Sequence, residues 1–257
     1  MPQDVAGLAR AHGGEDALLA RLDQVFEAKV DRKVFEHMED ITGLIGWYAH
    51  GNEPSHHVAY LCAYAGQPWR TQARLQQIMR SQYAARPDGL AGNDDLGQMS
   101  AWYVFTALGF YPVTPASNQY IIGRPFLPHA TLVLPNGKRF SILADGLDDA
   151  HPYIGGVTLN GRPLKRAFLR HAEIMAGGEL RFTLQAEPNT AWAAGGAERA
   201  YLMRKYAGTA SSRRGRRRQP PAAPLRWHAA FPASPRSDGA VRLGKGYASR
   251  RRCVSAR

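Results

Sequence analysis

Apolar residues recur at helical spacing between Asp4 and Leu108. Asp4 is placed to cap a helix over VAGLARAH, and Gly13-Gly14 ends that helix. A second apolar stripe follows, formed by Leu18, Leu19, Leu22, Val25 and Phe26. Three more helices are predicted: from Ser55 to Gly66, from Pro68 through residue 85, and from Asp95 to Leu108 with Gly109 as the stop.

After Tyr111 the pattern changes to short runs rich in β-branched and aromatic residues. The runs are NQYIIG, ATLVL, RFSILA, GVTLN and LRFTLQ, and turn pairs such as Asn136-Gly137 separate them. Helices followed by strands favour an α+β fold, in which a helical array packs against a small antiparallel sheet module. We expect the helical part over residues 1–112 and the antiparallel β module over residues 113–203.

Charge is distributed unevenly along the 257 residues, whose net charge is +12. Residues 204–257 hold 15 Lys and Arg against one acidic residue, whereas residues 1–203 hold 18 against 20. The basic end is rich in Arg, Pro and Ala without a regular period, so we expect a disordered tail. Such a tail is either a polybasic arm for nucleic acid or the product of a reading-frame change. The abrupt loss of patterning near Met203 favours the second origin.

The sequence gives little indication of a membrane span or of disulfide bonds. No run of 18 apolar residues is present, and the first residues lack the pattern of a secretory signal. We expect no membrane span, and a cytoplasmic location if the chain is made as written. Cys62 and Cys253 are too few for a disulfide framework or a zinc site.

Two polar loops precede predicted helices, GNEPSHH at residues 51–57 and PDGLAGNDD at residues 87–95. If the helices alternate up and down, these two helices are parallel and their amino-terminal ends share a face. On that face gather the strongly polar side chains of the helical half: Glu53, His56, His57, Asp94 and Asp95. This clustering predicts a functional site.

The position of the acids predicts their charge. Helix dipoles and free backbone N–H groups lower the pKa of a carboxyl at a helix amino terminus, so Asp94 and Asp95 are expected to be ionised. An ionised carboxylate can accept a proton from water or hold a hard cation, but it cannot protonate a leaving group. Hydrolysis at this face therefore needs a second carboxyl with a raised pKa.

Simpler roles fit the same residues. Asp95 as an N-cap with Asp94 as an extra first-turn acid would contribute about 1 kcal/mol of helix stability and no chemistry. His56 and His57 could bond to neighbouring carbonyls, and adjacent histidines do not form a zinc motif. The loop of residues 88–95 also lacks the alternate acids and closing glutamate of an EF-hand.

Long motifs are similar to those of one enzyme family. GNEPSHHVAYLCAYAGQPWRTQARLQQIMRSQY, PDGLAGNDDLGQMSAWYVFTALGFYPV, LPNGKRFSI and HAEIMAGGEL resemble the C-terminal catalytic region of glycoside hydrolase family 92, the calcium-dependent exo-acting α-mannosidases. The similarity extends from about Pro2 to Asn189. It implies an (α/α)6 barrel preceded by a β-sandwich, and inverting hydrolysis of terminal α-mannose in glycans with a bound calcium ion (Ca2+). The family is typically secreted or periplasmic.

The resemblance implies roles for single residues. Asp95 matches the general base that activates water, with Asp94 and Asn93 as supporting or substituting groups. Asn52 and Glu53 match contributors to the calcium and sugar pocket.

His57 and Trp102 are further candidates for the lining of that pocket. Calcium would pull the mannose ring toward the flattened geometry of an oxocarbenium-like transition state.

The family's general-acid glutamate lies a few residues upstream of the segment that begins this chain at Met1. We therefore expect a truncated chain that lacks this acid, the β-sandwich and the first barrel helices, and that has little or no mannosidase activity alone. Three functions stay open: a mannosidase that is part of a longer or complemented protein, a non-catalytic carbohydrate-binding remnant, or nucleic-acid or anionic-surface binding through the basic tail.

Overall fold

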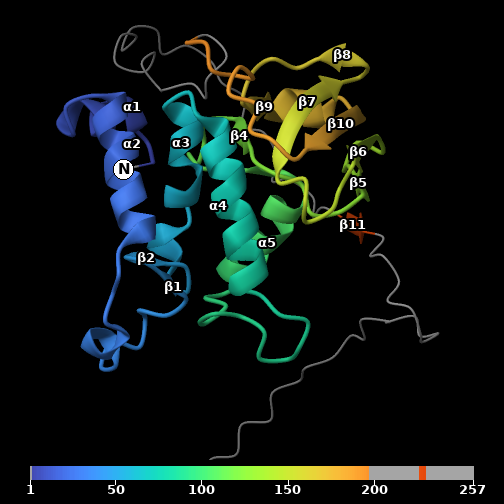
Figure 1. The fold of residues 1–257 in the computed structure, drawn as a ribbon. Coiled ribbons are helices and arrows are strands. Elements are labelled where there is room, and N and C mark those ends of the chain that lie inside the picture. Colours follow the sequence, from blue (N-terminus) through green and yellow to red (C-terminus); the bar gives the residue numbers. More distant parts are fainter. Residues whose placement is uncertain (1, 197–225, 230–257) are drawn as a thin grey trace, which may run out of the picture.

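The structure, a computed structural model, describes residues 2–196 and 226–229. Helices gather on one side and most β-strands on the other (Figure 1). The α-helices are α1 Val5–Ala11, α2 Glu15–Glu27, α3 Leu61–Tyr64, α4 Pro68–Ser81, α5 Gln98–Ala107 and α6 His171–Met175, and the 3-10 turns are η1 Arg32–Phe35, η2 Glu53–Ser55 and η3 Val58–Tyr60. The strands are β1 Leu44–Ile45, β2 Tyr48–Ala49, β3 Phe110–Tyr111, β4 Gln119–Ile122, β5 His129–Val133, β6 Arg139–Asp145, β7 Tyr153–Leu159, β8 Arg162–Pro163, β9 Phe168–Arg170, β10 Gly178–Gln185 and β11 Arg226–Ala229. Helices α1–α5 precede the strands of the two larger sheets, as predicted, but the β1–β2 hairpin within the helical part and α6 among the strands were not predicted.

Several predicted helix ends are confirmed. The Asp4 carboxylate accepts a hydrogen bond from the backbone N–H of Gly7 (2.8 Å) and so caps α1. Gly13 and Gly14 have φ angles of 96° and 127°, which a right-handed helix cannot accommodate. Pro68 occupies the first turn of α4, where its missing N–H has no intrahelical partner to lose.

Two helices differ from the prediction, and both differences affect the polar loops. The segment from Ser55 to Gly66 is not one helix but two 3-10 turns followed by α3. In the turns, the N–H groups of His56 and Tyr60 bond to the carbonyls three residues earlier, both at 3.1 Å. Helix α5 begins at Gln98 instead of Asp95, because residues 95–97 all have left-handed backbone angles.

The main sheet is mixed and not wholly antiparallel as predicted. Its strand order is β11-β5-β6-β10-β7-β8. The expected hairpin at Asn136-Gly137 joins β5 and β6 antiparallel. However, β10 returns after a long connection and inserts between β6 and β7, parallel to the first and antiparallel to the second. A separate sheet has the order β3-β4-β9.

The expected disordered tail lies mostly outside the described residues. Residues 226–229 are described and form β11, which pairs antiparallel with β5. This short strand corrects the expectation of disorder for those four positions.

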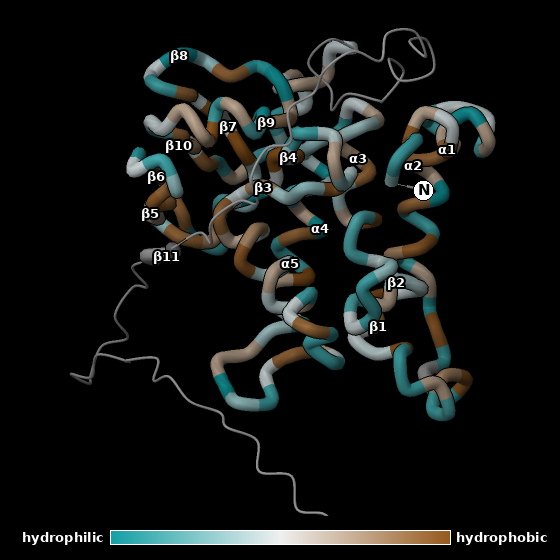
Figure 2. Tube along the Cα trace, turned by 180° about the vertical axis from the view of Figure 1, so that it is seen from behind, coloured by the Kyte–Doolittle hydropathy of each residue, from teal (hydrophilic) through white to brown (hydrophobic). Residues whose placement is uncertain are grey.

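A single hydrophobic cluster extends from the helices into the sheets. Figure 2 shows hydrophobic segments along the sheet strands and on α5. A buried hydrogen bond links the two halves, because Gln72 on α4 accepts from the backbone N–H of Ile154 on β7 (2.9 Å). The division at residues 112 and 113 stays a prediction, and the two parts share a core.

Cys62 lies in this core beneath α4. Its Sγ accepts a hydrogen bond from Arg74 (2.6 Å), and burial raises the pKa of the thiol to about 11. The thiol is therefore a packing group and not a nucleophile. Across the described ranges, no helix has both the length and the apolar character that crossing a membrane requires.

Candidate active site

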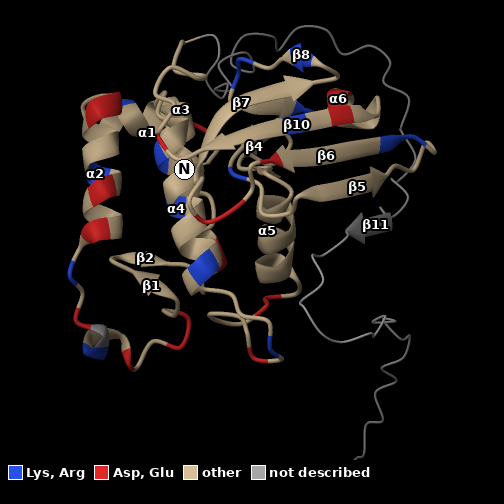
Figure 3. Ribbon diagram, turned by 45° about the vertical axis from the view of Figure 1, so that its right-hand side comes forward, with Lys and Arg blue, Asp and Glu red and all other residues tan. Residues whose placement is uncertain are grey.

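The two polar loops meet at the same end of the helices, near the β1–β2 hairpin. This end lies away from the main sheet in Figure 1, and Figure 3 shows acidic residues on its loops. The contact depends on glycine: a β-carbon at Gly92 would stand 2.7 Å from the carbonyl oxygen of Gly51 and 2.9 Å from its Cα. A β-carbon at Gly51 would in turn overlap the hydroxyl of Thr42. The two backbones approach this closely only because neither residue has a side chain.

Beyond this contact, the segment of residues 53–64 runs alongside α5. Gln98 contacts His56 (3.2 Å between Nε2 and Nδ1), and Trp102 donates from Nε1 to the His56 carbonyl (3.2 Å). One turn further along both segments, the hydroxyls of Tyr60 and Thr106 share a hydrogen bond (2.9 Å). Because the contacts advance together along both segments, the two run parallel, as the alternating arrangement of helices predicts.

Glu53 and Asp95 form the centre of the site. Their carboxyl groups are exposed, and Glu53 lies close enough to raise the pKa of Asp95 above its ordinary value, through a hydrogen bond that one carboxyl can make to the other while it is protonated. The charge of Asp94 acts in the same direction. The expectation of a lowered pKa for Asp95 is therefore wrong. Its physical basis is missing, since the residue precedes the helix instead of starting it and has a carboxyl neighbour.

Asp94, not Asp95, caps α5. The Asp94 carboxylate accepts hydrogen bonds from the backbone N–H (2.9 Å) and the hydroxyl (2.7 Å) of Ser100. The capping role that the simpler interpretation gave to Asp95 thus belongs to its neighbour. Asp95 remains available for chemistry.

The backbone at Asp95 is strained. Asp95, Leu96 and Gly97 have φ angles of 47°, 57° and 97°, and the Leu96 side chain is fully exposed. Left-handed angles at a leucine that gains nothing from burial are costly and persist only where the surroundings impose them. Such strain concentrates at functional sites.

The two histidines behave as the simpler interpretation predicts, since both bond to carbonyls. His56 is buried and donates from Nε2 to the carbonyl of His50 (3.0 Å). Burial lowers the pKa of His56. His57 is half-buried and hydrogen-bonded to the Pro54 carbonyl, and burial lowers its pKa as well. Both rings are therefore positioned as neutral groups.

Sequence reasoning missed His50, which lies behind the site. Its Nδ1 contacts the Tyr48 hydroxyl (2.8 Å) and its Nε2 the Tyr83 hydroxyl (2.7 Å), while Tyr83 donates to the Met99 carbonyl (3.3 Å). This direction leaves His50 donating from Nε2 and accepting at Nδ1, as a neutral ring does. Burial, reinforced by His56, lowers the pKa of His50 to about 3. No local sequence motif marks this residue.

The other predicted site residues, Trp102, Asn52 and Asn93, differ in how far they are buried. Trp102 is completely buried, so in this structure it supports His56 from behind and does not face a ligand. Asn52 is half-buried and precedes η2 without making a capping bond, and Asn93 is exposed.

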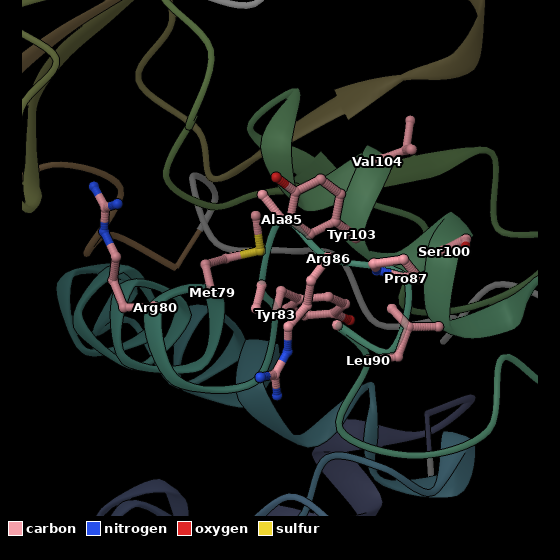
Figure 4. A pocket seen from close by; sticks show the side chains of 12 residues that line it. Met79, Arg80, Tyr83, Ala85, Arg86, Pro87, Leu90, Ser100, Tyr103 and Val104 are labelled. Carbon is pink, nitrogen blue, oxygen red and sulfur yellow. The ribbon is translucent and has the colours of Figure 1, made fainter. Parts of the chain in front are cut away.

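A cavity of about 520 Å³ lies beside the first turns of α5, and Ser100, which donates to Asp94, forms part of its wall (Figure 4). Its wall includes Tyr83, Ser100 and Tyr103 but not the Glu53–Asp95 pair. Both side chains of the pair are exposed, and the pocket that the sequence predicts around them stays a prediction.

The site offers oxygen atoms of the kind that bind calcium, but fewer of them than a calcium ion needs. Glu53 and Asp95 offer oxygen donors of the kind that calcium prefers, and a cation would relieve the repulsion between two carboxylates in contact. Within the described part of the chain, no three His, Cys, Asp or Glu side chains are grouped closely enough to hold a metal ion by themselves. The donor set fits a calcium ion that takes its other ligands from amide oxygens, water or a sugar.

Known proteins are similar to this chain in sequence and in fold. The glycosyl hydrolase family 92 catalytic domain matches residues 1–186. An uncharacterized secreted glycosidase of Arthroderma benhamiae is 30% identical over 198 residues, covering 76% of this chain and 23% of the fungal protein.

Solved structures of family 92 enzymes are also similar to this chain. The GH92 α-mannosidase BT3965 of Bacteroides thetaiotaomicron is 38% identical with a TM-score of 0.71, and it aligns with 79% of this chain and 26% of its own. The inverting mannosidase BT2199 of the same bacterium is 37% identical with a TM-score of 0.68, over 78% of this chain and 28% of its own. The chain thus spans about a quarter of the length of these relatives. It belongs to glycoside hydrolase family 92.

Proposed function

We propose that this chain carries the water-activating part of a calcium-assisted α-mannosidase that releases terminal α-mannose from glycans with inversion. The contact between the Glu53 and Asp95 carboxyls, on loops that the family's motifs occupy, is the observation that carries the proposal. BT3965, a GH92 α-mannosidase, has been solved in complex with mannoimidazole, and BT2199 is described as an inverting mannosidase. The helical half would then be the C-terminal part of an (α/α)6 barrel.

Asp95 is proposed as the general base. Its exposed carboxylate, with a pKa raised by Glu53, is a stronger proton acceptor than an ordinary aspartate. It removes a proton from the water that attacks the anomeric carbon of mannose. Asp94 and Asn93 support this loop, Asp94 by capping α5.

Glu53 is proposed to bind calcium and sugar together with Asn52. When bound, calcium supplies positive charge that holds the sugar hydroxyls and favours a flattened ring. His57 and Trp102 contribute by fixing the turn that carries these residues.

Glu53 is not the general acid. An inverting enzyme needs its acid and base carboxyls about 6.5–9.5 Å apart to leave room for water. Carboxyls in hydrogen-bond contact are too close for that arrangement. We propose that the acid comes from outside these two loops, and that the full-length protein is secreted like its fungal relative.

A substrate that needs no acid tests this assignment. Fluoride leaves without protonation, so we expect the purified chain with calcium to hydrolyse α-mannosyl fluoride, giving β-mannose first, while alkyl α-mannosides react little. Asp95→Asn should lower the rate about 10²- to 10⁴-fold. Proton NMR follows both the rate and the anomer.

Asp88→Asn is the matched control, because Asp88 lies on the same loop and pairs with Arg86 at the surface (3.3 Å). This variant should retain the wild-type rate. Rapid hydrolysis of alkyl mannosides by the chain alone would contradict the assignment of the acid. Binding of mannose and calcium without any hydrolysis would instead favour the non-catalytic carbohydrate-binding function.

A further inference from the structure

Besides the contact between Gly51 and Gly92, a set of hydrogen bonds made by Gln98 joins the two loops of the proposed site. Gln98, the first residue of α5, is half-buried, and its backbone N–H donates to the Asp95 carbonyl (3.2 Å). Its side-chain amide nitrogen lies 3.2 Å from Nδ1 of His56 and 3.1 Å from the Tyr111 hydroxyl. One side chain therefore links the helix that follows Asp95 to the turn that follows Glu53 and to strand β3.

The direction of these hydrogen bonds is fixed. The His50 carbonyl can only accept, so Nε2 of His56 carries the proton and donates to it. Nδ1 of the neutral ring is then an acceptor, and it must face a donor. The Gln98 amide has two hydrogens, one for His56 and one for the Tyr111 oxygen. A carboxylate at position 98 cannot replace it.

The link is close to the reacting groups in sequence. Glu53 lies between Gly51 and His56, and Asp95 lies between Gly92 and Gln98. Each carboxyl is thus held between a backbone contact on one side and a side-chain hydrogen bond on the other. Only short turns separate the contacts from the carboxyls, so a shift at either contact reaches the pair.

We propose that Gln98 is a positioning residue which, through His56, holds the Glu53 turn against the Asp95 loop and so fixes the separation of the two carboxyl groups. This inference rests on the proposed function only for the chemical use of that separation. The contact itself is testable without any substrate.

The test is a double-mutant cycle read by NMR at one fixed pH. Glu53→Gln should shift the carboxyl ¹³C signal of Asp95 because the two groups touch. In a Gln98→Met background, which keeps the side-chain length but donates no hydrogen bond, that shift should fall to less than half. If Gln98→Met leaves the shift unchanged, or if Glu53→Gln causes none in the wild-type chain, the proposal is overturned.

Gln76→Met is the matched control. Gln76 is also half-buried and donates its amide to a carbonyl, that of Asp149 (3.0 Å), but this partner lies in the loop between β6 and β7 and not at the proposed site. This variant should lose a similar hydrogen bond and leave the Asp95 signal of the cycle intact. A loss of the coupling in Gln76→Met would show a general loss of structure and contradict the specific role.

Kinetics give the second readout. With α-mannosyl fluoride, Gln98→Met should lower kcat about tenfold while KM changes less than threefold, because misplaced groups slow the chemical step more than binding. An unchanged kcat alongside a lost NMR coupling would contradict a role in positioning for catalysis. A wild-type chain that hydrolyses no fluoride would refute the proposed function alone, since the NMR cycle needs no turnover.

Discussion

Gly92→Ala is expected to separate the Glu53 and Asp95 loops and to reduce hydrolysis of α-mannosyl fluoride at least 100-fold. The added methyl would meet the backbone of Gly51, with its carbonyl oxygen at 2.7 Å, and no rotation of a side chain relieves that overlap. Overpacking of this kind costs about 1–3 kcal/mol of unfolding free energy. A displacement near 1 Å in a catalytic pair is enough for the loss of rate. Denaturant unfolding and the fluoride assay measure the two effects.

Two further variants make this result specific. Gly156→Ala in β7 adds a methyl where no atom lies within 4 Å and where the backbone angles suit alanine, so stability and rate should stay near the wild-type values. Thr42→Ala removes the nearby hydroxyl but not the backbone overlap, and should not rescue Gly92→Ala. If Gly92→Ala behaved like Gly156→Ala, the close approach of the loops would not be needed for the site.

Acid is expected to lower the stability of the folded protein through His50. The pKa of His50 is about 3 in the folded chain because burial disfavours the charged ring, and it returns to about 6.5 on unfolding. A lowered pKa means that the unfolded state binds the proton first as the pH falls. The stability that the neutral ring provides is therefore complete above pH 6.5 and is lost between pH 6.5 and about 3. The loss is about 1.4 kcal/mol per pH unit, or roughly 2 kcal/mol by pH 5.

His50→Gln isolates this effect. The variant should be less stable at pH 7.5, because it loses the contacts with Tyr48 and Tyr83, but its stability should fall less steeply below pH 6.5. Burial lowers the pKa of His56 as well, so part of the slope will remain. His37→Gln, at an exposed position, should keep the wild-type slope. Urea unfolding at several pH values gives the comparison, and equal slopes in all three proteins would refute the role of His50.

The sequence predicted the elements whose signals are local. Asp4 caps α1 through a contact three residues away, and Pro68 starts α4 through its own ring geometry. Asn136-Gly137 makes a hairpin within a few residues. In each case the interaction that determines the local structure joins residues only a few positions apart in the sequence.

What the sequence did not predict depends on distant partners. Three left-handed residues delay α5, and they follow the close approach of Gly92 to the Gly51 loop, a contact between segments about 40 positions apart. The raised pKa of Asp95 comes from Glu53, a carboxyl 42 positions earlier that becomes a neighbour only in the folded chain. The parallel pairing of β10 with β6 likewise depends on where a returning strand finds a free edge.

The central claim is that Glu53 and Asp95 belong to one site, in which Glu53 holds calcium and sugar and the neighbouring Asp95 carboxylate activates water. Calorimetric titration of calcium into the wild-type chain, Glu53→Gln, Asp95→Asn and the double variant, each with and without mannose, tests it most directly. We predict that the wild-type chain binds calcium more tightly when mannose is present, that each single variant weakens calcium binding at least tenfold, and that the double variant is scarcely weaker than either single one. A wild-type chain that binds no calcium, or variants whose effects simply multiply, would contradict a shared site.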